Sequence, residues 1–128
     1  MPALERLAGL RVVATPGAID DARWTGDDVL VLRLAPDDAF AIRATAVAVD
    51  DPHAIVVDDH GFVGAWCTLA DVTPHVEWWP PVERPALAQG AVAGVPAKAW
   101  IETDDRVLLV ATVAAAATLA ERLGWSLG

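Results

Sequence analysis

The chain has 128 residues, and 18 acidic against 9 basic side chains give it a formal net charge of −9 at pH 7. This charge argues against nucleic acid or an anionic membrane as the partner, because no cluster of Lys and Arg reverses it locally. No apolar run approaches the ~18 residues of a membrane helix, the N-terminus lacks the pattern of a secretory signal, and the single cysteine excludes an internal disulfide. We therefore expect one cytoplasmic domain spanning residues 1–128.

The first third of the chain predicts a helix followed by strands. Leu4, Leu7 and Ala8 share one helical face within Ala3–Gly9. Leu10–Ala14 then predicts a strand that ends at Thr15-Pro16-Gly17, since proline lacks the amide proton that a ladder needs. Val29–Leu34 predicts a buried strand.

The middle of the chain is less regular. Phe40–Val49 is compatible with a helix that begins after Pro36, but the period-two pattern of 44–49 favours a hairpin that leads into a strand. Ala54–Val57 and Phe62–Trp66 predict a second hairpin, whose turn is the polar stretch 58–61. Thr68 and Asp71 have the spacing of a capping box, so a short helix is expected through Val72.

The last third has the clearest pattern. It predicts three strands, Ala88–Ala93, Ala97–Glu102 and Val107–Val110. A helix is expected over Ala114–Leu123, with Val113, Ala116, Ala120 and Leu123 on one face. The expected fold is therefore α+β: a mostly antiparallel sheet of hairpins with a C-terminal helix packed on it, ferredoxin-like or related.

Tryptophans supply the candidate contact residues for a ligand or partner. The chain holds 6 Trp and no Tyr, and Trp78 and Trp79 adjoin three prolines within Glu77–Pro85. We expect this stretch to be an ordered crossing that exposes one of its two indoles. Trp66 and Trp100 lie on predicted strands, where filling of the core is the simpler interpretation.

Catalytic and metal-binding patterns are weak. The segments Asp50-Asp51-Pro52-His53 and Asp58-Asp59-His60 could in principle ligate a metal, but both occupy predicted turns, where such residues are common. A nucleophile with a general base requires at least a thiol and an imidazole, which Cys67 and either His60 or His75 could supply. A lone cysteine, however, is most often a small buried hydrophobic residue. We predict no catalytic residue, no metal ligand and no cofactor.

Two stretches carry a family resemblance. The segment 88–100, followed by 106–123, resembles the end of the gamma subunit of heterotetrameric sarcosine oxidase, a family grouped with aminomethyltransferase-like folate domains. The segment 32–40 resembles that family's Leu-x-Pro-Asp-Glu turn. The resemblance implies a ferredoxin-like subunit that packs against larger, cofactor-bearing partners and contributes no catalytic residue.

Two hypotheses for function follow. The first is a non-catalytic accessory or interaction protein that binds a protein partner or forms a homo-oligomer. The alternative is a small-molecule binding domain, for a ligand resembling a folate or an amine metabolite, with a cleft lined by Trp66, Trp78, Trp79 and Trp100.

Overall fold

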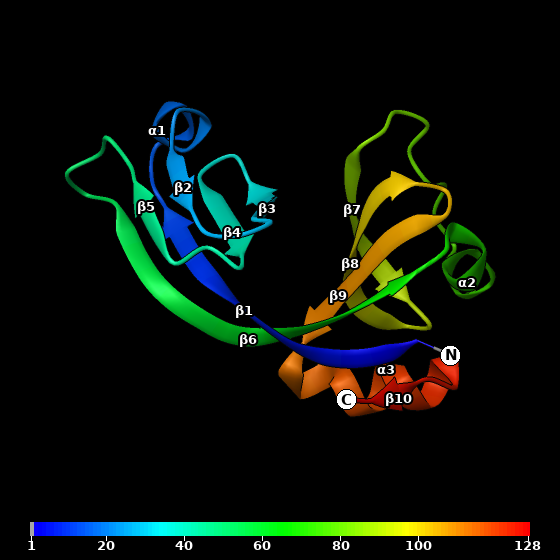
Figure 1. The fold of residues 1–128 in the computed structure, drawn as a ribbon. Helices are drawn as coiled ribbons and strands as arrows, with labels where there is room; N and C mark the ends of the chain where they lie inside the picture. The colour runs from blue at the N-terminus through cyan, green and yellow to red at the C-terminus, as the bar shows by residue number, and fades with distance from the viewer. Residues whose placement is uncertain (1) are drawn as a thin grey trace. The chain divides into compact units, whose positions relative to one another are not determined.

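The computed structural model describes residues 2–128, and these form a mostly β structure with short helices (Figure 1). The strands are β1 (Ala3–Val13), β2 (Arg23–Thr25), β3 (Leu30–Ala35), β4 (Asp38–Ile42), β5 (Ala46–Ala48), β6 (Ile55–Cys67), β7 (Ala86–Val92), β8 (Val95–Thr103), β9 (Arg106–Thr112) and β10 (Ser126–Leu127). The helices are α1 (Pro16–Asp20), α2 (Leu69–Val72) and α3 (Ala116–Leu123), with 3-10 turns η1 (Thr73–His75) and η2 (Val113–Ala115).

The chain is organised in two compact units. Unit 1 contains the described residues up to Arg6 together with Gly61–Gly128, and unit 2 contains Leu7–His60. The hydrogen-bonded order of the main sheet is β3-β4-β1-β6-β9-β8-β7, while β10 pairs in parallel with the start of β1 and β2 pairs with β5. β1 and β6 each contribute residues to both units, so the chain passes between the units along strands.

Alternation of side chains along the strands gives unit 1 its core. On β8 and β9, Ala99, Ile101, Val107 and Leu109 point to one face and are almost completely buried. This face packs against α3, whose Leu119 is fully buried. Alanines in the facing positions let helix and sheet approach closely, which is the usual arrangement of a helix that covers a sheet.

The C-terminal helix matches its prediction with one addition. α3 begins at Ala116 after the turn η2, and it ends at Gly124, which adopts the left-handed conformation (φ 71°) that terminates many helices. Ala116 and Ala120 of the predicted stripe are buried, and Val113 and Leu123 pack at its margins. Leu119, which the predicted stripe omitted, lies at its centre.

Unit 2 has its own small cores beneath β1 and β4. Val12 and Ala39 are fully buried with Ile19 of α1, and Trp24 packs against the edge of this cluster. Gly9 is paired with Ile42, and a methyl group on Gly9 would lie 2.1 Å from the carbonyl oxygen of Ala41. Close backbone approach therefore requires glycine at this point of the β1–β4 pairing.

The predicted ferredoxin-like α+β fold is wrong. That fold needs helices long enough to cover its sheet, whereas α3, the longest helix in residues 2–128, has 8 residues. The expected helix over Ala3–Gly9 is the first part of β1. β1 pairs with β10 at Ala3 and Leu4, with β4 from Gly9 on, and with β6 on its other side, and this pairing with distant segments outweighed the local helical spacing of the leucines.

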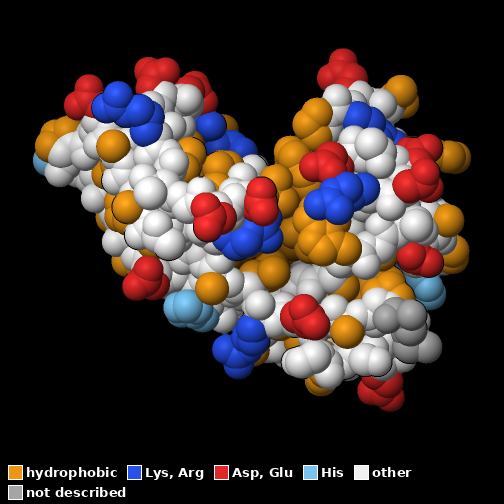
Figure 2. Space-filling view, in the orientation of Figure 1, with side chains coloured by type: hydrophobic (Ala, Val, Ile, Leu, Met, Phe, Trp, Pro, Cys, Tyr) orange, Lys and Arg blue, Asp and Glu red, His pale blue; other side chains and the backbone are white. Residues whose placement is uncertain are grey.

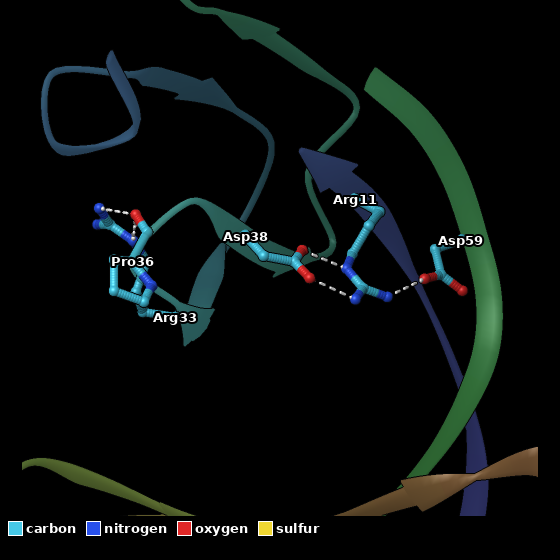
Figure 3. A network of polar contacts seen from close by, with 5 residues as sticks. All are labelled: Arg11, Arg33, Pro36, Asp38 and Asp59. Atoms are coloured by element: carbon cyan, nitrogen blue, oxygen red, sulfur yellow. Dashed lines mark hydrogen bonds and ion pairs between the residues drawn. The ribbon is translucent and has the colours of Figure 1, made fainter. Parts of the chain in front are cut away.

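The predicted hairpin over 54–66 is also wrong, because β6 continues straight through the polar stretch 58–61. Arg11 of β1 explains how a strand accommodates Asp59. The Arg11 guanidinium donates two hydrogen bonds to Asp38, of 2.5 and 2.6 Å, and one of 3.4 Å to Asp59 (Figure 3). Asp38 and Asp59 raise the pKa of Arg11, and their hydrogen bonds compensate the charges within the sheet.

Nearby, Arg33 of β3 is held in a comparable way. Its guanidinium donates to the carbonyl oxygen of Pro36, with a shortest bond of 2.7 Å (Figure 3). It also donates to Asp20 at 2.8 Å. A charged side chain bound back onto its own turn is one way in which proteins protect a strand at the end of a sheet.

Several local predictions are confirmed. Thr68 and Asp71 form the capping box of α2, with side-chain bonds of 3.2 and 2.9 Å to each other's backbone amides. The three strands predicted in the last third are β7, β8 and β9. Phe40–Val49 is not a helix: it includes the end of β4 and all of β5. Within residues 2–128, no helix is both long and apolar enough to cross a membrane.

Leu109→Ala tests the core of unit 1. Leu109 is fully buried on β9, so removal of its methyl groups should lower the free energy of unfolding by about 2–5 kcal/mol in urea melts. Asp104→Ala is the control: its side chain is 78% exposed and bonds Arg84, so its loss should cost about 1 kcal/mol or less. Equal effects of the two substitutions would contradict this description of the core.

Candidate functional site

The segment between η1 and β7 is the candidate site, and its first part is tied to unit 1 by Trp78. The indole Nε1 of Trp78 donates a hydrogen bond of 3.0 Å to the carbonyl oxygen of Ala91, on β7. The ring lies directly on Gly90: a methyl group added there would be 2.8 Å from Nε1 and 2.9 Å from Cδ1. Next to it, the Ala93 amide donates to the carbonyl oxygen of His75 at 2.7 Å. Trp78 is therefore an anchor for the segment.

The second part of the segment is held by Arg84. Its Nη2 donates to Asp104 Oδ1 at 3.1 Å, and Asp104 lies in the turn between β8 and β9. Directly after Arg84, the chain enters β7 at Ala86 and pairs along its length with β8. The segment is thus fastened to unit 1 on both sides of residues 79–83.

Between the two anchors, the chain presents apolar side chains to solvent. Trp79 is 94% exposed and Val82 is 93% exposed, the two largest values among the exposed large hydrophobic residues. Pro80 and Pro81 between them are half-buried. We call residues 79–82 the Trp79–Val82 tip. Figure 2 shows apolar and acidic side chains side by side over the loop that joins η1 to β7, in the upper right of the view.

The four tryptophans named from the sequence do not form one cleft. Trp66 and Trp100 both align with Leu108 of β9, and Leu87 of β7 continues the row. This row lies on the face opposite the unit 1 core, because the alternate strand residues are the core residues. Trp78 packs at the core face and Trp79 is in solvent. The prediction that one of these two adjacent indoles is exposed is confirmed.

Trp66 has a cation over its ring. The Arg106 guanidinium lies 4.0 Å from the ring centroid, and its Nε is 2.5 Å from the Glu102 carboxylate. Trp66 remains 37% exposed, so this arrangement covers the ring only in part. The Nε1 of Trp100 is buried and has no hydrogen-bond partner in residues 2–128, which leaves packing to hold that indole. Both residues therefore behave mainly as structural side chains.

A depression of about 660 Å³ lies beside the anchor, a volume that a small ligand could occupy. Its wall consists of Pro74, His75, Val76, Glu77, Trp78, Ala91, Ala93 and Gly94. Arg122 approaches its margin, where it donates to the Ala93 carbonyl oxygen at 2.8 Å. In this wall the Trp78 indole N–H, the carbonyl oxygens of Ala91 and Ala93 and the Ala93 amide are already bonded within the fold, and the lining is polar as well as apolar.

Cys67 is a structural residue. Its Sγ contacts the Val107 carbonyl oxygen at 3.5 Å, at the buried end of β6. Burial, together with the nearby negative charge of Asp71, raises the pKa of the thiol to about 12. The thiol therefore stays protonated at neutral pH, which is unfavourable for a nucleophile.

In both acid and histidine pairs, one carboxylate bonds within the fold. Asp51 accepts backbone hydrogen bonds from Thr15 at 3.0 Å and from His53 at 2.9 Å, and these bonds lower its pKa. His60 lies within β6, next to the Asp59 that bonds Arg11. Across residues 2–128, no three His, Cys, Asp or Glu side chains are grouped so that they could hold a metal ion.

Sequence reasoning found the tip but missed its anchors. Gly90 lies inside the predicted strand 88–93 and Asp104 between the next two predicted strands, and neither position indicates that Gly90 contacts the Trp78 ring or that Asp104 binds Arg84. A glycine inside a strand does signal close approach of another group. The identity of that group depends on long-range folding and has no local signal.

Gly90→Ala should release the first anchor. The new methyl group would overlap the Trp78 ring, so we expect a loss of about 1–3 kcal/mol in stability and a shifted Trp78 indole N–H resonance in NMR spectra. Gly17→Ala is the matched control, because a methyl group there meets nothing within 4 Å. An unchanged Trp78 indole resonance in Gly90→Ala would contradict the contact between the Trp78 ring and Gly90.

Cys67 should resist alkylation in the native state. Raising the pKa from 9.0 to about 12 lowers the thiolate fraction at pH 8 about a thousandfold. We expect slow labelling by a thiol reagent in buffer and prompt, stoichiometric labelling in denaturant. Prompt native labelling would show that the thiol is exposed or activated.

Comparison with known proteins adds no identification. No protein-family model matches this chain, and no curated protein is significantly similar to it in sequence. The resemblance to the sarcosine oxidase gamma subunit thus has no support from these comparisons, and the ferredoxin-like fold that it implied is wrong.

Proposed function

We propose that this protein is a non-catalytic interaction protein and that the Trp79–Val82 tip is its contact with a protein partner. The observation that carries the proposal is the exposure of Trp79 and Val82, 94% and 93%, on a segment that is fastened on both sides. Tryptophan is the residue most enriched among the energetically dominant positions of protein interfaces.

An indole that stays in water forgoes the free energy of burial. Burial of one tryptophan removes about 150–250 Å² of surface, and at about 25 cal/mol per Å² this is worth roughly 4–6 kcal/mol. Trp78, the neighbouring residue, is partly buried and obtains part of this stabilisation within the fold, whereas Trp79 obtains almost none. A partner that covers Trp79 would supply it.

The anchors support the proposal through preorganisation. The hydrogen bonds of Trp78 and Arg84 restrict both sides of the tip, and two consecutive prolines restrict its backbone. A segment that is already ordered loses little conformational entropy on binding, so more of the contact energy becomes affinity. Cys67, the one nucleophile candidate with histidines along the chain, is buried and protonated, which favours a binding role over a catalytic one.

A second candidate function is binding of a small molecule in the depression beside Trp78. Its volume of about 660 Å³ and the indole in its wall favour this alternative. The depression differs from the predicted cleft, because Trp66 and Trp100 lie on the opposite face of the sheet. A ligand of this kind should alter the Trp78 indole resonance and leave that of Trp66 unchanged.

The test of the first proposal compares capture of partners by three purified forms of the intact protein. The tip variant carries Trp79→Ser and Val82→Ser, and the control carries Ile55→Ser and Val57→Ser, two exposed apolar residues of β6 in unit 2. We expect a partner that the wild type and the control retain and that the tip variant loses, with affinity weakened at least about 30-fold. Equal capture by all three forms would overturn the proposal.

A further inference from the structure

We infer that the partner of the Trp79–Val82 tip is a positively charged protein segment, one with an apolar anchor beside Lys or Arg side chains. This inference rests on the proposed function and specifies the chemistry of the partner. It begins from the charges that accompany the tip, because charged groups around a small apolar contact determine which partners approach it.

Carboxylates flank the tip on both sides. Glu77 precedes it and Glu83 follows it, and both side chains are exposed. Within residues 2–128, neither carboxylate takes part in an ion pair. In the view of Figure 2, apolar, acidic and basic side chains adjoin over this loop.

The cation nearest to the tip in sequence, Arg84, is already compensated. Arg84 is bound to Asp104, and Asp105 adds a further carboxylate in the same turn. Between residues 73 and 97, Arg84 is the only Lys or Arg in the sequence. The residues that flank the tip and the turn that binds Arg84 therefore carry four carboxylates against one guanidinium, in keeping with the net charge of −9 of the whole chain.

These charges also decide against a second copy of the chain as the occupant. Two copies would bring like charges together, and like-charge contacts disfavour association. The area is also small: two side chains and two half-buried prolines fall well short of the ~800 Å² per partner that a stable interface typically buries. A transient contact with a basic partner satisfies both constraints.

The experiment selects short random peptides, displayed on phage, for binding to the intact wild-type protein. We expect enriched peptides with a net positive charge and at least one aromatic or aliphatic anchor, whose binding the Trp79→Ser, Val82→Ser variant loses. Neutralisation by Glu77→Gln with Glu83→Gln should weaken the selected peptides about 3- to 10-fold at about 50 mM salt and much less at about 500 mM salt.

A charge-matched control separates a local effect from a general one. Asp27→Asn with Asp58→Asn removes two exposed carboxylates from unit 2 and should leave binding within about twofold. Neutral or acidic peptides that still require Trp79 would overturn the inference about charge and leave the proposed function standing. Peptides that bind the tip variant as well as the wild type would overturn both. Concentration-dependent dimerisation that Trp79→Ser abolishes, measured by sedimentation, would identify a second copy as the occupant and also overturn the inference.

Discussion

The alternation of side chains along β6, β7, β8 and β9 is the constraint on which unit 1 depends. One face carries the core residues that pack against α3, and the other carries the row of Trp66, Leu108, Trp100 and Leu87. Because successive residues of a strand point to opposite faces, a tryptophan at an even position of β8 cannot join the core at the odd positions. The same alternation places Gly90 at the core face, where its missing side chain leaves room for Trp78.

Unit 2 shows how charge is accommodated within strands. The long strand β6 contains Asp58, Asp59 and His60, a composition typical of a turn. Arg11 of β1 bonds Asp38 of β4 and Asp59 of β6, so one guanidinium binds two carboxylates on different strands (Figure 3). A fork of fixed donors suits this task better than an ammonium group, since it can bind one carboxylate with two bonds and still reach another.

Two adjacent tryptophans differ in burial: Trp78 packs against the core and Trp79 is exposed. This contrast supports the proposed function. Trp78 packs on Gly90 and bonds Ala91, whereas Trp79 contributes almost nothing to the fold. The arrangement resembles the way interfaces in general are built: a rigid framework holds a few large side chains that become buried only on binding. The negative charges of Glu77 and Glu83, on either side of the tip, then influence which partners can approach Trp79.

The sequence by itself determined the elements that local chemistry specifies: the capping box of α2, the hairpin strands β7 to β9, the helix ending at Gly124, and the exposure of one indole beside the prolines. Only the tertiary structure decided the rest. Ala3–Gly9 became strand because β4 and β10 supplied hydrogen-bond partners, and 58–61 stayed in β6, where Arg11 bonds Asp59. Strand pairing joins residues far apart in sequence, so a local pattern of leucines or aspartates cannot reveal it. The contact between Trp78 and Gly90 could not be predicted for the same reason, because it depends on the tertiary structure in which β7 pairs with β8.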